Sequence, residues 1–259
     1  MLGIGMFSWF SYDLPILERL TLIKEVGFDA TGLWWAGDNK NEQPEMARKI
    51  GLQIDNIHTP FVEPNRLWLD GAAGDDYQNT LISCVEDCSV HEIPAAVIHL
   101  TPFQDEAPVT DIGLKRIAKI IEVAERKDIL LAFENLSVLD HLDAVFERFL
   151  SPCVGFCYDS GHENWNHADR DCLSLYGDKL IALHINDNFG DADSHMLPFD
   201  GTVDWSEKMK GLKQCKEVDY FTFEVDFNRK HECCAIYKDW TARAYLEAAY
   251  AKATKLLKL

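Results

Sequence analysis

Four acidic or imidazole side chains stand at the ends of four apolar stretches of this 259-residue sequence. They are Glu134 in LLAFENL, Asp159 in VGFCYDSGH, His184 in LIALHINDN and Glu224 in YFTFEV. Neighbouring members are about 25 to 40 residues apart, roughly the length of one strand-helix unit. Carboxylates suit hard divalent cations such as Mg²⁺, and an imidazole favours Mn²⁺, Co²⁺ or Zn²⁺. The pattern therefore predicts one divalent metal ion held by these four residues.

Such a site would act on a substrate that offers two neighbouring oxygens to the metal. The hydroxyl and carbonyl oxygens of a ketose meet this need, and the metal would act as a Lewis acid when the adjacent carbon loses its proton. Glu134 and Glu224 are expected on opposite sides of the substrate, one to remove the proton and the other to return it. We therefore expect a metal-dependent sugar or sugar-phosphate isomerase or epimerase with a metal-stabilised enediolate. A dehydratase or lyase acting on a keto-polyol fits the same residues.

Further polar residues are expected on the same face. His58 in NIHTP and His99 in VIHLTP each end a strand candidate and are followed by Thr-Pro. His162 lies three residues after Asp159, and Asp193 and His195 form an Asp-x-His pair. We interpret His58, His99, His162 and His195 as substrate-binding residues.

Aromatic side chains near the first two strand candidates could line the same site. Trp34 is predicted to bind substrate, because an aromatic face suits a sugar ring. The sequence offers three further candidates for this apolar wall, which are Trp9, Phe10 and Trp35. The remaining histidines lie in helical or loop contexts and are predicted to be surface residues: His91, His141, His167 and His231.

The elements that must position these residues alternate between strand and helix. The strand candidates are 3–9, 28–34, 53–58, 95–100, 129–134, 154–159, 180–185 and 219–225. The helical patterns between them cover 14–26, 43–50, 77–91, 111–127, 139–150, 168–176 and 240–258. This alternation predicts an α/β fold, a single (β/α)₈ TIM barrel whose C-terminal strand ends form the active face. Residues 186–205 are the longest non-periodic stretch and are expected to lie over that face.

Two details favour parallel strands. The apolar runs are nearly continuous, as expected where both faces of a sheet are covered. The helix-Gly-strand sequences EVGFDA (25–30) and KIGLQI (49–54) also repeat one short connection. An open doubly wound sheet is the competing fold, but no Gly-rich phosphate loop follows the first strand.

Composition narrows the class of protein further. The length suits one domain spanning residues 1–259, since a TIM barrel takes about 250 residues. The net charge of −18 argues against a nucleic-acid partner, and the sequence has no apolar run long enough to span a membrane. The N-terminus lacks the features of a signal peptide, so we expect a cytoplasmic protein whose eight cysteines are free structural thiols. A small-molecule sugar is the expected partner, and the chain could form an oligomer.

Taken together, the motifs FENL, YDSGH, HINDN, DGTVDW after Asp-x-His, and FEV resemble the xylose isomerase-like TIM-barrel superfamily. That superfamily holds sugar phosphate isomerases, epimerases and endonuclease IV. The resemblance covers nearly the whole chain. It implies a metal held by Glu134, Asp159, His184 and Glu224, with His162 near the substrate.

The resemblance also extends to the three-zinc ligand set of endonuclease IV. It implies zinc sites at His58, His99 and Glu134, at Glu134, Asp159, His184 and Glu224, and at His162, Asp193 and His195. The acidic composition, and the lack of a lengthened basic or aromatic loop that could wedge into a duplex, argue against an abasic-site endonuclease. The family's usual Pro-Gly-x-Gly segment also reads Pro198-Phe199-Asp200-Gly201 here.

Overall fold

The computed structural model describes residues 2–36, 40–167, 169–227 and 229–259. Its strands, within these residues, are β1 (Gly3–Phe7), β2 (Ala30–Trp34), β3 (Gln53–His58), β4 (Ala95–Ile98), β5 (Leu130–Glu134), β6 (Val154–Asp159), β7 (Leu180–His184) and β8 (Tyr220–Phe223). The α-helices are α1 (Ile16–Val26), α2 (Gln43–Lys49), α3 (Ala72–Val90), α4 (Asp111–Lys127), α5 (Asp140–Arg148), α6 (Ser160–Asn166), α7 (Cys172–Tyr176), α8 (Trp205–Leu212) and α9 (Ala242–Leu256). Short 3₁₀ helices are η1 (Pro64–Leu67), η2 (Gly177–Lys179) and η3 (Glu232–Tyr237).

The strands form one parallel sheet in the order β7-β6-β5-β4-β3-β2-β1-β8. Ile185, directly after β7, closes the sheet against β8. Its N–H donates to the Thr222 carbonyl at 2.9 Å, and its carbonyl accepts from Glu224 N at 3.2 Å. The predicted (β/α)₈ barrel is confirmed, and an open doubly wound sheet is excluded.

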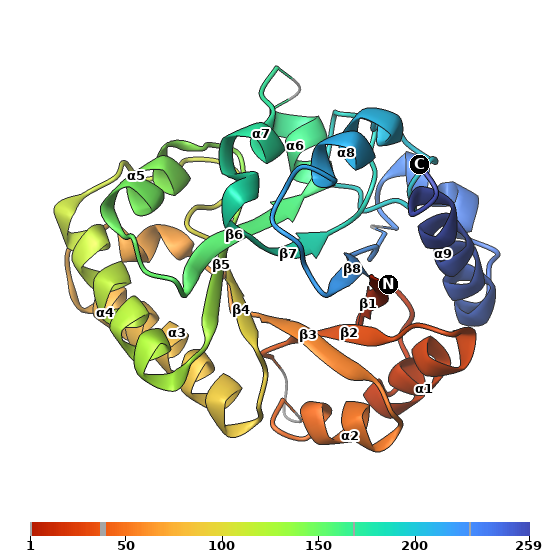
Figure 1. Ribbon diagram of the computed structural model, residues 1–259, viewed down its shortest axis with the longest axis horizontal. Coiled ribbons are helices and arrows are strands. Elements are labelled where there is room, and N and C mark those ends of the chain that lie inside the picture. Colours follow the sequence, from red (N-terminus) through yellow and green to blue (C-terminus); the bar gives the residue numbers. More distant parts are fainter. Residues whose placement is uncertain (1, 37–39, 168, 228) are drawn as a thin grey trace.

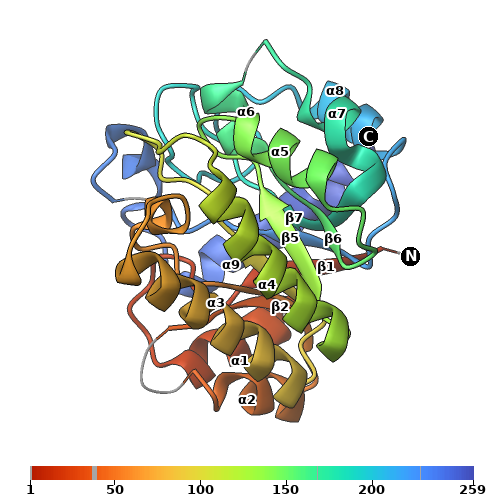
Figure 2. The same ribbon diagram turned by 90° about the vertical axis from the view of Figure 1, so that its left-hand side faces the viewer.

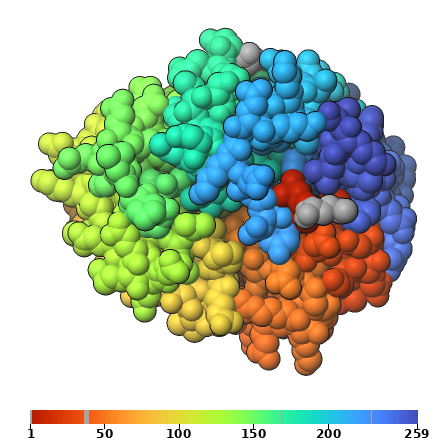
Figure 3. Space-filling model, in the orientation of Figure 1, coloured from red at the N-terminus to blue at the C-terminus, as the bar shows by residue number. Residues whose placement is uncertain are grey.

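The helices lie outside the strands and follow the chain around the barrel. Figure 1 shows the strands at the centre with the helices at the periphery. Seen from the side, α3 and α4 run next to each other over the same part of the barrel (Figure 2). In the space-filling view, the sequence colours pass in order around the molecule, so each strand-helix unit lies beside the next one (Figure 3). This winding brings the C-terminal ends of all strands to one face.

A small cluster of buried side chains lies apart from the main hydrophobic core. It consists of Val97, Ala132, Cys157 and Ala182, from the neighbouring strands β4 to β7. Each lies two residues before a candidate functional residue, namely His99, Glu134, Asp159 and His184. Side chains alternate along a strand, so each cluster member lies on the same face of its strand as that functional residue. The functional side chains thus stand directly above a layer of small apolar ones.

The helix predictions differ from the structure at several ends. Helix α3 begins at Ala72 rather than residue 77, and α7 covers Cys172–Tyr176 of the predicted 168–176, in which Ala168 lies outside the described residues. Helices α6 and α8 were not predicted. Both begin directly after a carboxylate cap: Asp159 accepts from His162 N, and Asp204 accepts from Glu207 N. A helix of seven or eight residues depends more on such a cap than on apolar periodicity.

Two further predictions concern the state of the cysteines and the absence of membrane-spanning segments. The eight cysteines form no disulfide bond among the described residues, as expected, and six of them are buried. Of the helices in the described parts of the chain, none has the length and apolar character that a membrane crossing requires.

Arg116 on α4 fixes the loop that follows β3. Its side chain is only 2% exposed and donates to the carbonyls of Arg66, Leu67, Leu69 and Gly71. The guanidinium also pairs with Asp75 on α3 at 3.0 Å. One side chain therefore holds α4, α3 and η1 together.

We predict that Arg116→Met lowers the free energy of unfolding by about 3 kcal/mol or more, because buried carbonyls lose their donor. Urea unfolding followed by circular dichroism measures this change. Arg243→Met is the matched control, since Arg243 pairs with Glu25 on the surface, and it should change stability by less than about 1 kcal/mol. Equal effects of the two substitutions would contradict the role assigned to Arg116.

Candidate functional site

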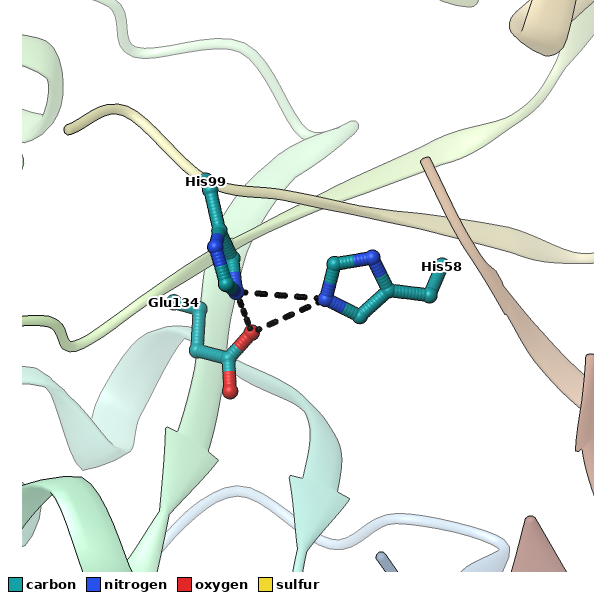
Figure 4. A group of neighbouring side chains, drawn as sticks. All are labelled: His58, His99 and Glu134. Atoms are coloured by element: carbon teal, nitrogen blue, oxygen red, sulfur yellow. Dashed lines mark hydrogen bonds and ion pairs between the residues drawn. The ribbon is translucent and has the colours of Figure 1, made fainter. Parts of the chain in front are cut away.

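Glu134 lies at the centre of the site, at the end of β5, with only 1% of its surface exposed. Its Oε1 lies 3.0 Å from His184 Nδ1, and its Oε2 lies 2.9 Å from His99 Nε2. His58 Nε2 is 3.6 Å from the same Oε2 and 3.2 Å from His99 Nε2. Figure 4 shows His58 and His99 pointing at one carboxylate oxygen. A single carboxylate thus joins imidazoles from three other strand ends.

The four residues that the sequence predicts as metal ligands converge in the structure. Glu134, Asp159 and His184 end β5, β6 and β7, and Glu224 directly follows β8. All four are buried, and one potential ligand atom from each lies within 4.8 Å of the others. His184 Nδ1 is 2.8 Å from Glu224 Oε2. Their convergence is observed, while their role as ligands stays a prediction.

Neighbouring groups hold Asp159 in place. Its Oδ1 accepts from His162 N and its Oδ2 from Asn186 Nδ2, both at 2.7 Å. Its backbone N–H and carbonyl pair with the side chain of Asn135, each at 2.8 Å. Such surrounding hydrogen bonds orient ligands in metal sites. Three buried carboxylates beside one imidazole also require positive charge nearby, so the donor set fits a hard divalent cation.

Protons on His184 and His162 balance the negative charge of the neighbouring carboxylates. Burial alone would raise the pKa of Glu134, but His184 and His99 hold it well below its usual range. Burial raises the pKa of Asp159 to about 7, and the charges of Glu134 and Glu224 contribute. Burial opposes charge on His184, yet Cys157, Glu224 and Glu134 raise its pKa well above the ordinary value. A bound cation would take over the role of these protons.

Two further groups with metal-ligand potential adjoin the four-residue set. One contains His162, Asp193 and His195, and the other His58, His99 and Glu134. Asp193 Oδ2 is 3.1 Å from His195 Nε2 and 3.5 Å from His162 Nε2. His195 Nδ1 donates to the Glu224 carbonyl at 2.9 Å. The structure therefore brings every sequence-predicted polar site residue to one place.

A pocket of about 100 Å³, here called the central pocket, opens in front of Glu134 and Glu224. Trp34 forms part of its wall and stacks on His58, with ring centroids 4.5 Å apart and planes at 24°. Phe61 and Phe103 complete the aromatic side. A ligand in the central pocket could thus reach both glutamates while its apolar face meets aromatic rings.

The other aromatic candidates do not line the central pocket. Trp35 points outward, and its Nε1 donates to Asp87 on α3 at 2.7 Å. Phe10 is fully buried in the main core. Trp9 lines a neighbouring pocket instead. For Trp35 and Phe10, the prediction of an aromatic wall is wrong. Trp35 directly follows Trp34 at the end of β2, where adjacent side chains point to opposite sides, and Phe10, in the loop after β1, packs into the main core.

Residues 20–249 match the family described as "Xylose isomerase-like TIM barrel". The chain belongs to this xylose isomerase-like family.

Individual relatives agree with this assignment. The uncharacterized protein y4fM of Sinorhizobium fredii (strain NBRC 101917 / NGR234) is 43% identical in an alignment 267 residues long. This alignment covers 84% of this chain and 83% of that protein. A structure of L-ribulose 3-epimerase is 18% identical, with a TM-score of 0.79, over 100% of this chain and 95% of that one. The crystal structure of IOLI protein with a binding zinc atom is 12% identical, with a TM-score of 0.74, over 99% of this chain and 98% of that one. At these identities the two structures show a shared fold.

Sequence reasoning missed three residues of the central pocket, and each had a signal. Phe61 and Phe103 both follow the Thr-Pro dipeptides after the strand-end histidines, so the repeated motif is Thr-Pro-Phe. Asp226 lies two residues after Glu224, and its Oδ1 is 3.6 Å from His195 Nδ1. Extending the strand alternation by one step would have found it.

The family's long loop after β7 is ordered around one carboxylate. Asp187 accepts from the backbone N–H groups of Phe199 and Val203, and from Trp205 Nε1. Phe199, which stands where the resemblance to the family predicts a glycine, has a φ of +72°. A non-glycine residue rarely adopts this left-handed backbone. The ordered loop supports the segment that carries Asp193 and His195.

Two histidines that were predicted to lie on the surface are buried. His141 Nε2 donates to the Ala107 carbonyl at 2.9 Å, and His167 Nε2 donates to the Leu136 carbonyl. Both have lowered pKa values, mainly because of burial. The prediction was wrong because a short polar segment gives no sign of the loop that covers it. The other two, His91 and His231, are partly exposed.

The carboxylates around His162 should keep its imidazole protonated in the metal-free protein. Burial lowers its pKa, but Asp159, Asp193 and Glu134 outweigh burial and raise it to about 10. We predict an imidazolium at pH 8, visible in histidine ring NMR spectra of protein treated with a chelator. The assigned resonance would contradict this prediction if it titrated near the ordinary value of 6.5.

The raised pKa of His162 makes the stability of the folded protein depend on pH. The folded protein holds this proton more tightly than the unfolded chain, so the stabilisation is complete below pH 6.5 and is lost as the pH rises towards 10. His162→Gln should therefore flatten the pH dependence of unfolding between those limits.

Proposed function

We propose that this family member is a sugar or sugar-phosphate isomerase or epimerase that uses one divalent metal ion. The observation that supports this proposal most is that Glu134 and Glu224 both contact the same atom, His184 Nδ1. His184 Nδ1 lies 3.0 Å from Glu134 Oε1 and 2.8 Å from Glu224 Oε2, and both glutamates line the central pocket. All candidate residues belong to one barrel, and we propose that this barrel acts as a single catalytic domain.

Glu134, Asp159, His184 and Glu224 would hold the ion, which we propose to be Mn²⁺, Mg²⁺, Co²⁺ or Zn²⁺. A divalent ion at this point would supply Lewis-acid polarisation of the substrate's carbonyl and hydroxyl oxygens. The IOLI protein, which shares this fold, was crystallised with a binding zinc atom, and this supports a metal-binding role for the fold.

The two glutamates supply the proton transfers in this proposal. The neighbouring histidines outweigh burial and lower the pKa of both Glu134 and Glu224, so either carboxyl group can serve in its ionised form as the proton acceptor. One glutamate, in its ionised form, takes the proton from the carbon next to the carbonyl. The second glutamate, protonated by solvent, gives its proton to the opposite face of that carbon, and exchange with solvent then restores both carboxyl groups. His162 and His195 line the pocket, and their Nε2 atoms meet Asp193, so a bound substrate oxygen would share these N–H donors with the Asp193 carboxylate. The similar fold of L-ribulose 3-epimerase supports a reaction of this class.

Turnover in deuterium oxide tests the proposal directly. Deuterium should enter the sugar carbon next to the carbonyl, detected by NMR or mass spectrometry. We predict that Glu134→Gln and Glu224→Gln each lower turnover by about 10³-fold or more, since each removes a charged ligand and a proton carrier. Glu247→Gln, on the exposed side of α9, is the control and should retain wild-type turnover. A processed sugar without exchange would contradict proton abstraction.

One observation favours a second candidate, an endonuclease that cleaves DNA at abasic sites. The additional ligand groups around His58 and around Asp193 also form in the structure, as a three-zinc site would require. The net charge of −18 opposes binding to a phosphate backbone. The number of bound metal ions separates the two candidates.

We predict that elemental analysis finds one metal ion per chain, and that His195→Ala keeps it. In the single-metal proposal His195 touches substrate, so its loss should lower kcat/KM by about 10- to 100-fold without releasing metal. Three zinc ions per chain, with one released by His195→Ala, would instead indicate the trinuclear enzyme. Cleavage of an abasic duplex by that protein would complete the case for it.

A further inference from the structure

A larger pocket adjoins the central pocket and is not used by the proposed reaction. This side pocket has a volume of about 400 Å³ and is lined by Trp9, Ser11, Asp193, His195, Asp226, Phe227 and Arg229. Three of these residues, Asp193, His195 and Asp226, also line the central pocket. A ligand that fills the central pocket could therefore continue past His195 into the side pocket.

Two loops from neighbouring strands build the side pocket and are joined by hydrogen bonds. Ser11, in the loop after β1, donates through Oγ to the Phe227 carbonyl at 2.8 Å. Arg229, in the loop after β8, donates back to the Ser11 carbonyl through Nε at 3.3 Å and Nη2 at 3.1 Å. Ser11 has a φ of +72°, an uncommon backbone state that persists only where the surroundings hold it. The pocket wall is thus preorganised.

The guanidinium of Arg229 is held at a fixed orientation at the rim of the side pocket. It lies over two aromatic rings, 5.0 Å from the centre of Phe227 and 5.2 Å from the centre of Tyr12. Within the described residues, no hydrogen bond from its Nη1 is found. The guanidinium of Arg229 offers planar N–H donors in the same pocket as the carboxylate of Asp226 and the ring of Trp9. The two polar groups are suited to neighbouring hydroxyls, and the ring is suited to the apolar face of a sugar.

The charges around the side pocket favour a neutral ligand over a phosphate. Asp193 and Asp226 bring two carboxylates, and the basic groups among the lining residues are Arg229 and His195. His195 already pairs with Asp193 at 3.1 Å and with Asp226 at 3.6 Å, so it does not add a free positive charge for an anion. A phosphate would meet repulsion from both carboxylates, whereas hydroxyl groups can donate to them and accept from the guanidinium.

The sizes of the pockets also point to a ligand with more than one part. The central pocket, at about 100 Å³, is small compared with typical ligand pockets of roughly 300 to 1,000 Å³. A third pocket of about 550 Å³ lies beyond Phe61 and Phe103, but its walls include Pro64 and Leu69 and suit an apolar group. The side pocket, in contrast, has mostly polar walls, and it is where a polar ligand could extend from the central pocket.

We propose that the side pocket is a subsite for a second, uncharged polyhydroxylated unit. The substrate would then be a glycoside or disaccharide whose carbonyl-bearing unit occupies the central pocket. This inference rests on the proposed function, because it places the reacting carbon between Glu134 and Glu224. Arg229 and Trp9 would determine specificity for the second unit.

The test compares three related compounds: a keto-sugar, the same keto-sugar carrying a neutral hexose at a hydroxyl distant from the reacting carbon, and its phosphate ester at that hydroxyl. Deuterium exchange should give the highest kcat/KM for the hexose-bearing compound. Arg229→Gln should lower that value by about 10- to 100-fold, as expected for loss of a charged hydrogen-bond donor. Its effect on the unextended keto-sugar should be at least ten times smaller. Arg229→Lys should recover part of the loss, because it keeps the charge without the planar fork.

Arg243→Gln is the matched control, since Arg243 is an exposed arginine on α9 that pairs with Glu25, and it should leave all three values unchanged. A phosphate ester preferred through Arg229 would overturn the inference in favour of an anion site. Equal rates for all three compounds would overturn it as well. Calorimetric binding of the hexose-bearing compound separates the two proposals: binding that depends on Arg229 without any exchange would retain the subsite and reject the isomerase or epimerase.

Discussion

The carboxylate of Glu134 is the constraint on which the rest of the site depends. A charge buried this deeply is tolerated only if other groups compensate it. Here the compensation comes from His58, His99 and His184, which are delivered by β3, β4 and β7 to the two oxygens of one side chain. The barrel makes this possible because parallel strands end together on one face.

The layer below the site explains how so many polar side chains fit into the barrel mouth. Val97, Ala132, Cys157 and Ala182 are small, and each precedes a functional residue by two positions on its strand. Larger side chains there would push the imidazoles and carboxylates apart, because protein interiors are close-packed. The loops after β1, β7 and β8 then add the outer wall, and their left-handed residues Ser11, His195 and Phe199 mark where the chain is held against its local preference.

The strands and the central residues could be predicted because their signals are local. An apolar run that ends in Glu134 or His184 predicts both a strand and the residue at which that strand ends. Helices α6 and α8 could not be predicted in this way, since seven or eight residues capped by a carboxylate carry little periodicity. The buried state of His141 depends on a distant carbonyl, and the side pocket depends on two loops more than 200 residues apart in sequence. Such features follow from tertiary contacts that no single stretch encodes.

Binding of one metal ion by Glu134, Asp159, His184 and Glu224 together is the central claim. The most direct measurement is a crystal structure of the protein grown with Mn²⁺, with anomalous diffraction recorded at the manganese edge. We predict one strong anomalous peak between these four side chains, with His58 and His99 turned towards Glu134 but carrying no metal of their own. A map with no peak between the four residues would contradict the claim.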